Sequence, residues 1–263
     1  MKHTYIHTEL TPPLASIVLN RPEVHNALHI GMIREISSLW NALESDRSIN
    51  LVRLTSRGKN FCAGADLNWM REGMKQSGEQ LIKESLELAD LFWSIRSSRL
   101  ITIAAVKGRA MGGAIGLLAA SDMVLAESSS VFAFSEVRLG LIPATIAPFA
   151  LQKMGYSRSL ELMLSARSFT AEMASQYGLV HLVCEEGALD EVTKKMTDSL
   201  LLNGPVAMQS VKSLLNKLDH GTPRGDTRQL TAELIARHRI SPEGQEGITA
   251  FFEKRNPNWH GKS

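Results

Sequence analysis

Residues 107–118 have the sequence KGRAMGGAIGLL and follow an apolar run over 100–106. This order predicts a buried strand, a glycine turn and then an apolar helix. Amides at the start of a helix have no partner within it and carry the positive end of its dipole. Gly112 and Gly113 lack a Cβ atom, so a ligand can approach those amides closely. The stretch therefore predicts an anion-binding turn, although such glycines equally allow a helix to pack closely on a sheet.

A second stretch with the same order of features lies upstream. The predicted strand 51–55 is followed by GKNFCAGADL over 58–67. Two such turns, each at the end of a strand, can direct one amide each at a single oxygen atom. Donors fixed where negative charge develops form an oxyanion hole. We therefore expect the two turns to belong to one catalytic site.

Composition limits the class of protein. The chain has 263 residues, 44% of them hydrophobic, and its 29 Lys and Arg against 27 Asp and Glu give a net charge of +2. It can bury a large core, and the balanced charge argues against nucleic acid as the main partner. Cys62 and Cys184 lack neighbours at metal-ligand spacing, so neither a metal nor a disulfide framework is expected. No apolar run is long enough for a signal peptide or a membrane span, which predicts a cytoplasmic protein without a membrane partner.

The remaining pattern predicts an α/β core over 1–200 and a helical region over 201–263. Strands are expected at 4–10 and 14–20 around Pro12 and Pro13, at 122–126 and 131–134, and at 179–183. Helices are expected from residue 30 and over 79–98, and after residue 188 with breaks at 203–205, 220–223 and 241–243. The predicted inner face of the 79–98 helix consists of Ile82, Ser85, Leu88, Ala89, Phe92 and Ile95.

Four motifs in this order resemble the enoyl-CoA hydratase/isomerase (crotonase) family. They are LNRP (19–22) with NAL (26–28), FCAGADL (61–67), the glycine turn 108–113, and Glu136 followed by GLIP (140–143). The resemblance covers essentially the whole chain. It implies an α/β spiral of ββα units with a C-terminal helical trimerisation region, and a homotrimer or a homohexamer built as a dimer of trimers. It also implies an acyl-CoA substrate, with coenzyme A as part of that substrate and no separate cofactor.

The same resemblance assigns the catalytic residues. The oxyanion donors are the amides of Ala65 and Gly113, the two turns identified above, and the acid/base is Glu136. Burial among Phe132, Phe134, Leu139 and Ile142 is expected to raise the pKa of Glu136 and make it a better proton shuttle. The alternative is a surface glutamate paired with Arg138.

The implied coenzyme A site has two walls and a contribution from the C-terminal helix. Its residues are Val24, His25, Ala27, Ala63, Ala65, Asp66, Leu67, Asn68, Gly112, Gly113 and Lys254. His25 stands where many relatives have a basic residue, which implies a pH-dependent phosphate contact or simply a solvated loop histidine. Lys254 or Arg255 would reach a phosphate in a neighbouring subunit, unless this helix end is merely solvated.

One position departs from the family pattern. Hydratases of the family usually carry a second glutamate one turn into the helix, where this chain has Gly116. One interpretation is a hydratase in which Glu136 works alone, because 66–71, 112–116 and 135–144 resemble bacterial methylglutaconyl-CoA hydratases of leucine and acyclic-terpene degradation. Another is a 3-enoyl to 2-enoyl-CoA isomerase, for which one glutamate suffices. A third is an inactive acyl-CoA-binding or RNA-binding scaffold, against which the near-neutral charge and Glu136 argue.

Overall fold

The computed structural model describes residues 3–219 and 224–260. The chain divides into two compact units, Met1–Thr193 and Lys194–Ser263. This division falls within helix α7 (Leu189–Leu201), whereas the expected boundary after residue 200 lies at its end. The larger unit contains both predicted glycine turns, and the smaller unit is built of helices.

A six-stranded sheet forms the centre of the larger unit, in the order β1-β2-β3-β4-β6-β9. The strands are β1 (Ile6–Thr11), β2 (Leu14–Leu19), β3 (Leu51–Ser56), β4 (Ile101–Val106), β6 (Met123–Glu127) and β9 (Leu182–Cys184). The predicted hairpin is confirmed, because β1 and β2 pair antiparallel with Thr11 opposite Leu14. The other pairs are parallel, and every residue of β4 is buried, as expected of a central strand covered on both faces.

The strand predicted over 179–183 begins later than expected. The amides of Leu179 and Val180 donate to the carbonyl oxygen of Ala174 at 2.9 and 3.1 Å, so these residues complete the exit from helix α6 (Ala171–Gln176). Gly178, with φ +87°, lies at this exit as predicted for a helix C-terminus.

A second, three-stranded sheet directly precedes the turn at Gly112 and the residue Glu136 along the chain. It contains β5 (Arg109–Met111), β7 (Val131–Ala133) and β8 (Phe169–Thr170) in the order β5-β7-β8. The sequence pattern predicts a glycine turn directly between strand and helix, and it misses β5. Gly108 turns the chain into β5 with φ +63°, and a Cβ atom there would overlap the carbonyl oxygen of Lys59. The consecutive strands β6 and β7, which are predicted at 122–126 and 131–134, belong to different sheets.

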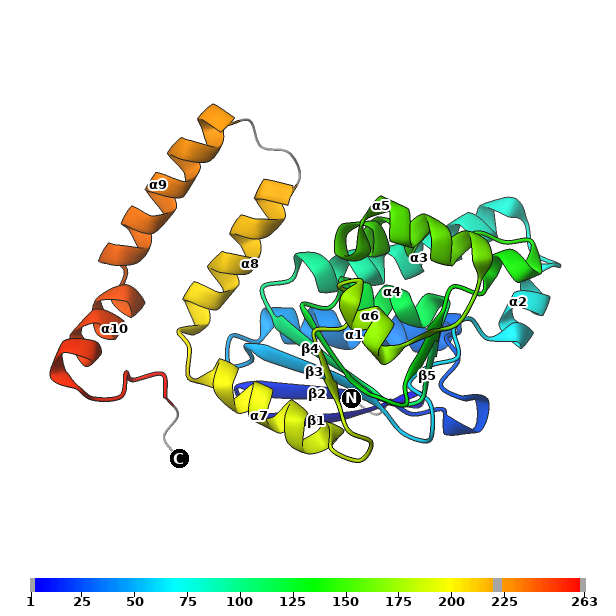
Figure 1. Cartoon of the computed structure of the whole chain (residues 1–263), viewed down its shortest axis with the longest axis horizontal. Coiled ribbons are helices and arrows are strands. Elements are labelled where there is room, and N and C mark those ends of the chain that lie inside the picture. Colours follow the sequence, from blue (N-terminus) through cyan, green and yellow to red (C-terminus); the bar gives the residue numbers. More distant parts are fainter. Residues whose placement is uncertain (1–2, 220–223, 261–263) are drawn as a thin grey trace. The chain divides into compact units, whose positions relative to one another are not determined.

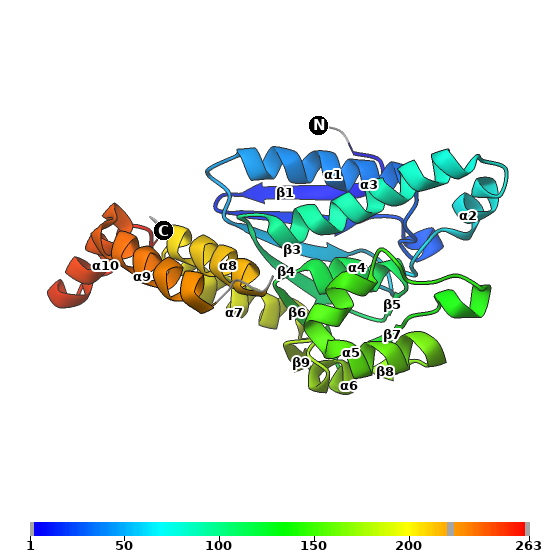
Figure 2. The same cartoon turned by 90° about the horizontal axis from the view of Figure 1, so that it is seen from above.

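Helices α1 (Ile30–Ser45) and α3 (Gly78–Ser97) lie side by side over the six-stranded sheet (Figures 1 and 2). The predicted face of α3 is correct at Phe92 and Ile95 but wrong at Ile82, which is 62% exposed. Glu84 is buried instead, because its carboxylate accepts the indole N–H of Trp69 at 2.7 Å. Trp69 belongs to α2 (Leu67–Gly73), a short helix that the sequence pattern misses.

The rest of the larger unit contains α4 (Gly113–Ala120) and α5 (Ala147–Ser165). Residues 114–120 of α4 are all buried, as predicted for an apolar helix without a polar face. The 3-10 turn η1 (Pro22–Val24) lies between β2 and α1, and the 3-10 turn η2 (Glu136–Leu139) follows β7.

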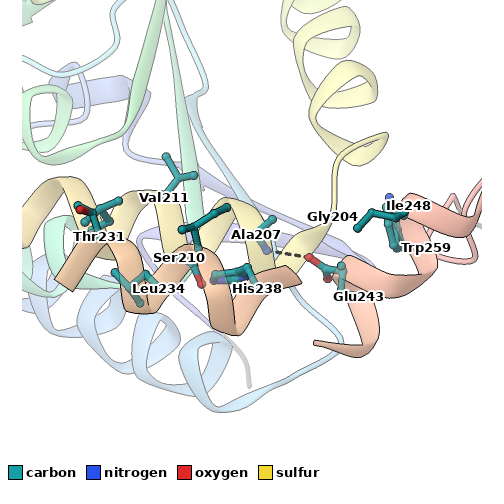
Figure 3. A pocket seen from close by; sticks show the side chains of 14 residues that line it. Gly204, Ala207, Ser210, Val211, Thr231, Leu234, His238, Glu243, Ile248 and Trp259 are labelled. Carbon is teal, nitrogen blue, oxygen red and sulfur yellow. Dashed lines mark hydrogen bonds between the residues drawn. The ribbon is translucent and has the colours of Figure 1, made fainter. Parts of the chain in front are cut away.

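The smaller unit contains α8 (Pro205–Asp219), α9 (Arg224–Ile240) and α10 (Pro242–Glu253). The predicted breaks at 203–205 and 241–243 are confirmed, whereas 220–223 lies outside the described residues. The Glu243 carboxylate accepts the amides of Val206 and Ala207 at 3.0 and 2.8 Å, so α10 caps the start of α8 (Figure 3). An apolar cavity of about 490 Å³ opens beside this contact, with Val211, Leu234 and Ile248 in its lining.

Candidate active site

The two predicted glycine turns meet in space. A Cβ atom on Gly64, which has φ +90°, would lie 2.7 Å from the carbonyl oxygen of Met111 and 3.6 Å from the amide nitrogen of Gly113. The main chain joins the turns: the amide of Cys62 donates to Arg109 at 3.1 Å, and the amide of Met111 donates to Cys62 at 3.0 Å. The segments 58–67 and 107–113 therefore form one structural unit, as the oxyanion-hole hypothesis requires.

The two proposed donor amides are available. Leu28 donates to the carbonyl of Gly64 at 2.7 Å and accepts from the amide of Asp66 at 2.8 Å, and these bonds flank Ala65. Among the hydrogen bonds within 3–219 and 224–260, none uses the amide of Ala65 or of Gly113 as donor. Gly113 is the first residue of α4, where an amide has no intrahelical acceptor. Two unused N–H groups thus lie on turns that main-chain hydrogen bonds join.

The Glu136 carboxylate lies directly beside these donors. Glu136 begins η2, and its Oε1 atom would lie 2.8 Å from a Cβ atom placed on Gly112, which has φ +49°. Its Oε2 atom is buried and has no hydrogen-bond partner in the part of the chain that the structure describes. Burial raises the pKa of Glu136 above its usual value, outweighing the local backbone interactions. A half-buried carboxylate with one unpaired oxygen, next to unused amides, is suited to proton transfer at an oxyanion site.

The surroundings of Glu136 bear both on the predicted enclosure of its carboxylate and on the alternative of a surface pair with Arg138. The Arg138 guanidinium donates to the carbonyl oxygen of Ala166 at 2.8 Å, so the alternative of a Glu136–Arg138 surface pair is not supported. Leu139 and Ile142 are 59% and 74% exposed, so they do not enclose the carboxylate as expected. Leu139 precedes the left-handed Gly140 and Ile142 follows it, in an irregular loop. The direction in which a side chain points cannot be deduced from periodicity in such a loop.

Phe132 and Phe134, which are expected to surround the Glu136 carboxylate, are both fully buried. Both rings stack on Phe169, with centroids 5.6 and 6.3 Å apart. This cluster fixes β7 against β8 and so fixes the start of η2. The aromatic residues therefore position the backbone that carries Glu136.

The predicted coenzyme A residues lie on two joined loops. The amide of Ala63 donates to the carbonyl of His25 at 2.9 Å, which connects the segment 20–28 to the segment 61–68. The exposed members of the set are His25, Ala63, Ala65, Leu67 and Asn68; Val24 is half-buried, and Ala27 is buried. The His25 ring lies 3.1 Å from the side-chain amide of Asn60. The two joined loops thus expose residues of both segments to solvent.

Asp66 differs from the other predicted contacts because its side chain is buried. Its carboxylate accepts from the Arg21 guanidinium and from the amide of Asn68, both at 2.9 Å. Burial acts to raise the pKa of Asp66, but these donors and the amide of Trp69 outweigh it and lower the pKa. Arg21 also donates to the carbonyl of Ala27 at 2.6 Å. Arg21 is not predicted as a site residue, yet its ion pair with Asp66 holds the two loops together. The available signal in the sequence is one charged residue in each of the two motifs.

Gly116 is closed to any side chain. A Cβ atom on Gly116 would overlap the ring of Phe92, which is fully buried. The departure from the two-glutamate pattern is therefore matched by an aromatic ring on the neighbouring helix α3.

The described residues contain no cluster of three or more His, Cys, Asp or Glu that could hold a metal ion. No helix in the described ranges has the length and apolar character to cross a membrane. Lys254 is an exposed residue at the end of α10, in the left-handed conformation with φ +54°. It belongs to the smaller unit, and its proposed phosphate contact stays a prediction.

Known proteins are similar to this chain over most of its length. Residues 10–262 match the family model described as enoyl-CoA hydratase/isomerase. Enoyl-CoA hydratase AKT6-1 of Alternaria alternata is 34% identical over 251 residues, covering 92% of this chain and 80% of that protein. Mevalonyl-coenzyme A hydratase sidH of Aspergillus fumigatus is 28% identical over 254 residues, covering 95% and 92%. The crystal structure of an enoyl-CoA hydratase from Shewanella pealeana has a TM-score of 0.93 at 40% identity, covering 97% of this chain and 96% of that chain.

Proposed function

The chain belongs to the enoyl-CoA hydratase/isomerase family, and we propose that it adds water to the double bond of a 2-enoyl-CoA thioester. The observation that carries this proposal is the position of the Glu136 carboxylate over Gly112, next to the unused amides of Gly113 and Ala65. A base and two oxyanion donors at one point are the groups that acyl-CoA enolate chemistry needs.

The proposed reaction uses Glu136 twice. Its carboxylate accepts a proton from water as the water oxygen bonds to the β-carbon, and the displaced electron pair moves to the thioester oxygen. The amides of Ala65 and Gly113 hold the resulting enolate oxygen. The protonated Glu136 then returns its proton to the α-carbon, so the net change is the addition of one water molecule. A raised pKa suits this role, because the carboxyl group must both take and release a proton.

Coenzyme A is assigned to the two joined loops. The exposed Ala63, Leu67 and Asn68 line one side, and Val24, His25 and Ala27 the other, with Asp66 acting through its backbone because its side chain is engaged by Arg21. Lys254 of a neighbouring subunit is the proposed phosphate contact. No cofactor other than the coenzyme A of the substrate is proposed.

The finer substrate assignment is 3-methylglutaconyl-CoA. It rests on the resemblance of 66–71, 112–116 and 135–144 to hydratases of that substrate and on the single carboxylate beside α4. The single carboxylate equally favours the second candidate, a 3-enoyl to 2-enoyl-CoA isomerase, in which Glu136 moves a proton between two carbons. One relative is named as a mevalonyl-coenzyme A hydratase, which indicates that hydratases of related sequence act on different acyl groups.

A homotrimer or homohexamer assembled through the helical unit is part of the proposal. This unit exposes large apolar side chains at Ile235, Ile240, Phe251 and Phe252, with exposed fractions of 61%, 78%, 79% and 77%. Apolar surface of this extent is typical of a surface that a partner covers. Sedimentation equilibrium would show a mass of three or six chains, and a monomer would contradict this part.

The reaction is tested by the near-ultraviolet absorbance of the conjugated thioester. The purified protein is given a simple 2-enoyl-CoA, 3-methylglutaconyl-CoA and a 3-enoyl-CoA in parallel. Loss of absorbance from a 2-enoyl substrate, with the hydroxyacyl product identified, supports the hydratase. Gain of absorbance from the 3-enoyl substrate alone supports the isomerase, and no change with any substrate contradicts both.

A further inference from the structure

We infer that Asn26 is a positioning residue for the oxyanion site, because its side chain fixes the main chain that directs the Ala65 amide. This inference rests on the proposed function and adds a residue to the machinery of that site. Asn26 is fully buried, so it acts through neighbouring main chain rather than on the substrate.

The direction of the Ala65 amide is set by Leu28. The two residues form an isolated parallel bridge, in which the amide of Leu28 donates to Gly64 at 2.7 Å and its carbonyl accepts from Asp66 at 2.8 Å. In a parallel pair, successive main-chain groups of an extended segment point to opposite sides. The groups on either side of Ala65 bond toward Leu28, so the Ala65 amide points away from Leu28. A displacement of Leu28 therefore redirects this donor.

The segment before Leu28 is irregular. After the 3-10 turn η1, His25 and Asn26 both have left-handed backbones, with φ of +53° and +56°. Residues other than glycine adopt this conformation at a cost, which asparagine bears better than most. Two such residues in succession persist only where the surrounding structure holds them in place.

The Asn26 side chain supplies such contacts. Its Oδ1 atom accepts the amide of Arg21 at 2.8 Å, and its Nδ2 atom donates to the carbonyl oxygens of Arg57 and Asn60 at 2.8 and 3.0 Å. The main-chain amide of Asn26 also donates to the carbonyl of Arg21 at 2.8 Å. One buried side chain therefore holds its own loop closed and joins it to a second loop.

These two loops lead to the two sides of the bridge. The loop 21–27 leads into Leu28, and the turn 57–60 leads from β3 into the segment that contains Ala65. A satisfied hydrogen-bond network inside a protein makes the backbone around it rigid. Without the Asn26 side chain, the two loops can shift against each other, and the Ala65 amide loses its alignment with the thioester oxygen.

The test measures the absorbance maximum of a bound conjugated thioester. Hydrogen bonds to the thioester oxygen draw electron density along the conjugated system, so correctly directed amides move the maximum to longer wavelength. A 2-enoyl-CoA is bound at saturation to Glu136→Gln protein, in which turnover is suppressed, with and without Asn26→Gly. Glycine adopts the left-handed backbone freely, so the substitution removes the side-chain bonds without adding strain. We expect Asn26→Gly to reduce the shift to longer wavelength. In protein that keeps Glu136, it should lower kcat on the order of tenfold to a hundredfold.

A second variant and a control accompany this measurement. Asn26→Asp keeps the size of the side chain but places an oxygen against two carbonyl groups, so it should act in the same direction, and it serves if the glycine variant does not fold. The control is Arg99→Ala, because the Arg99 guanidinium also donates to main-chain carbonyls, among them Ile49 and Asp46 at 2.8 and 2.7 Å. Arg99 precedes β4, whereas the donor turns follow the other ends of β3 and β4.

The position of the maximum separates a positioning role from a merely structural one. Arg99→Ala should lower the melting temperature but leave the maximum and kcat unchanged, because a loss of folded protein reduces the height of the band and not its wavelength. An unchanged maximum in folded Asn26→Gly or Asn26→Asp protein would overturn the role of Asn26. Inactivity of the wild-type protein toward every 2-enoyl-CoA and 3-enoyl-CoA would instead overturn the proposed function.

Discussion

The first and second turns of helix α4 use glycine for opposite purposes. At the first turn, Gly112 leaves room for the Glu136 carboxylate, and Gly113 presents an unused amide. At the second turn, Gly116 leaves room for the fully buried Phe92 ring. One turn is therefore open to a reactant and the other is filled by the protein itself. A glycine-rich motif indicates close approach, but only the approaching group shows whether the position serves catalysis or packing.

The contrast also bears on the proposal that the Glu136 carboxylate acts alone. The Oε2 atom of Glu136 is buried without a partner, whereas the space one turn further is occupied by hydrocarbon. An unpaired buried polar atom costs stability, so its presence calls for an explanation, and the proposed proton transfer supplies one. We therefore expect a large loss of turnover when the Glu136 carboxylate is replaced. We expect a smaller loss when a residue that supports a donor amide is replaced.

The largest expected effect comes from Glu136→Gln. Glutamine keeps the shape but cannot exchange a proton, so turnover should fall on the order of 10²-fold or more while affinity for coenzyme A stays unchanged. Replacing a desolvated carboxylate with a neutral amide should also raise the free energy of unfolding near pH 7. Steady-state kinetics, coenzyme A binding and urea unfolding of the same preparation measure the three quantities. Unchanged turnover would remove Glu136 from the mechanism and favour the inactive scaffold.

A second prediction concerns pH. Because the pKa of Glu136 is raised in the folded protein, its carboxylate takes up a proton at a higher pH than an ordinary glutamate does. The base form is then lost early, so kcat/KM should decline about tenfold per pH unit on an acidic limb that begins above the usual value of 4.5.

The contribution of Glu136 to the free energy of unfolding should depend on pH in the opposite direction to kcat/KM. A raised folded pKa contributes stability that is present below the unfolded pKa and is lost as pH rises through the folded pKa. The advantage of Glu136→Gln in urea unfolding should therefore grow with pH over this interval. A constant difference between the two proteins, or an acidic limb at the ordinary glutamate value, would show that burial does not perturb this group.

Much of the site could be predicted because its parts depend on local sequence. A strand, glycines and an apolar run determine where helix α4 begins, and the free amide at Gly113 follows from helix geometry. The turn at 58–67 carries the same information. Their meeting depends on a parallel arrangement of β3 and β4, which the alternation of strands and helices also predicts.

The unpredicted features depend on contacts between segments distant in sequence. Strand β5 is too short for a periodic pattern, and it exists because β7 pairs with it. The burial of Glu84 depends on Trp69 of a helix that the sequence does not mark, so hydrophobic spacing gives the wrong face there. Gly116 is interpretable only beside Phe92, and nothing in the sequence connects those two positions.

The smallest expected effect is that of Cys62→Ala. This variant tests whether the Cys62 side chain or the main chain alone holds the Ala65 amide in place. The fully buried Cys62 sulfur accepts the amide of Gly64 at 3.4 Å, and burial raises the pKa of the thiol to about 12, so it stays neutral. Cys62→Ala leaves that amide without an acceptor, a cost of about 1–3 kcal/mol that loosens the adjacent turn. We expect kcat to fall by a few-fold at constant KM, because the donor matters most when the enolate forms. Cys62→Ser restores an acceptor and should recover part of the loss. If the alanine variant keeps its full kcat, the Cys62–Ala110 main-chain bridge alone fixes the donor, and the cysteine serves only the core.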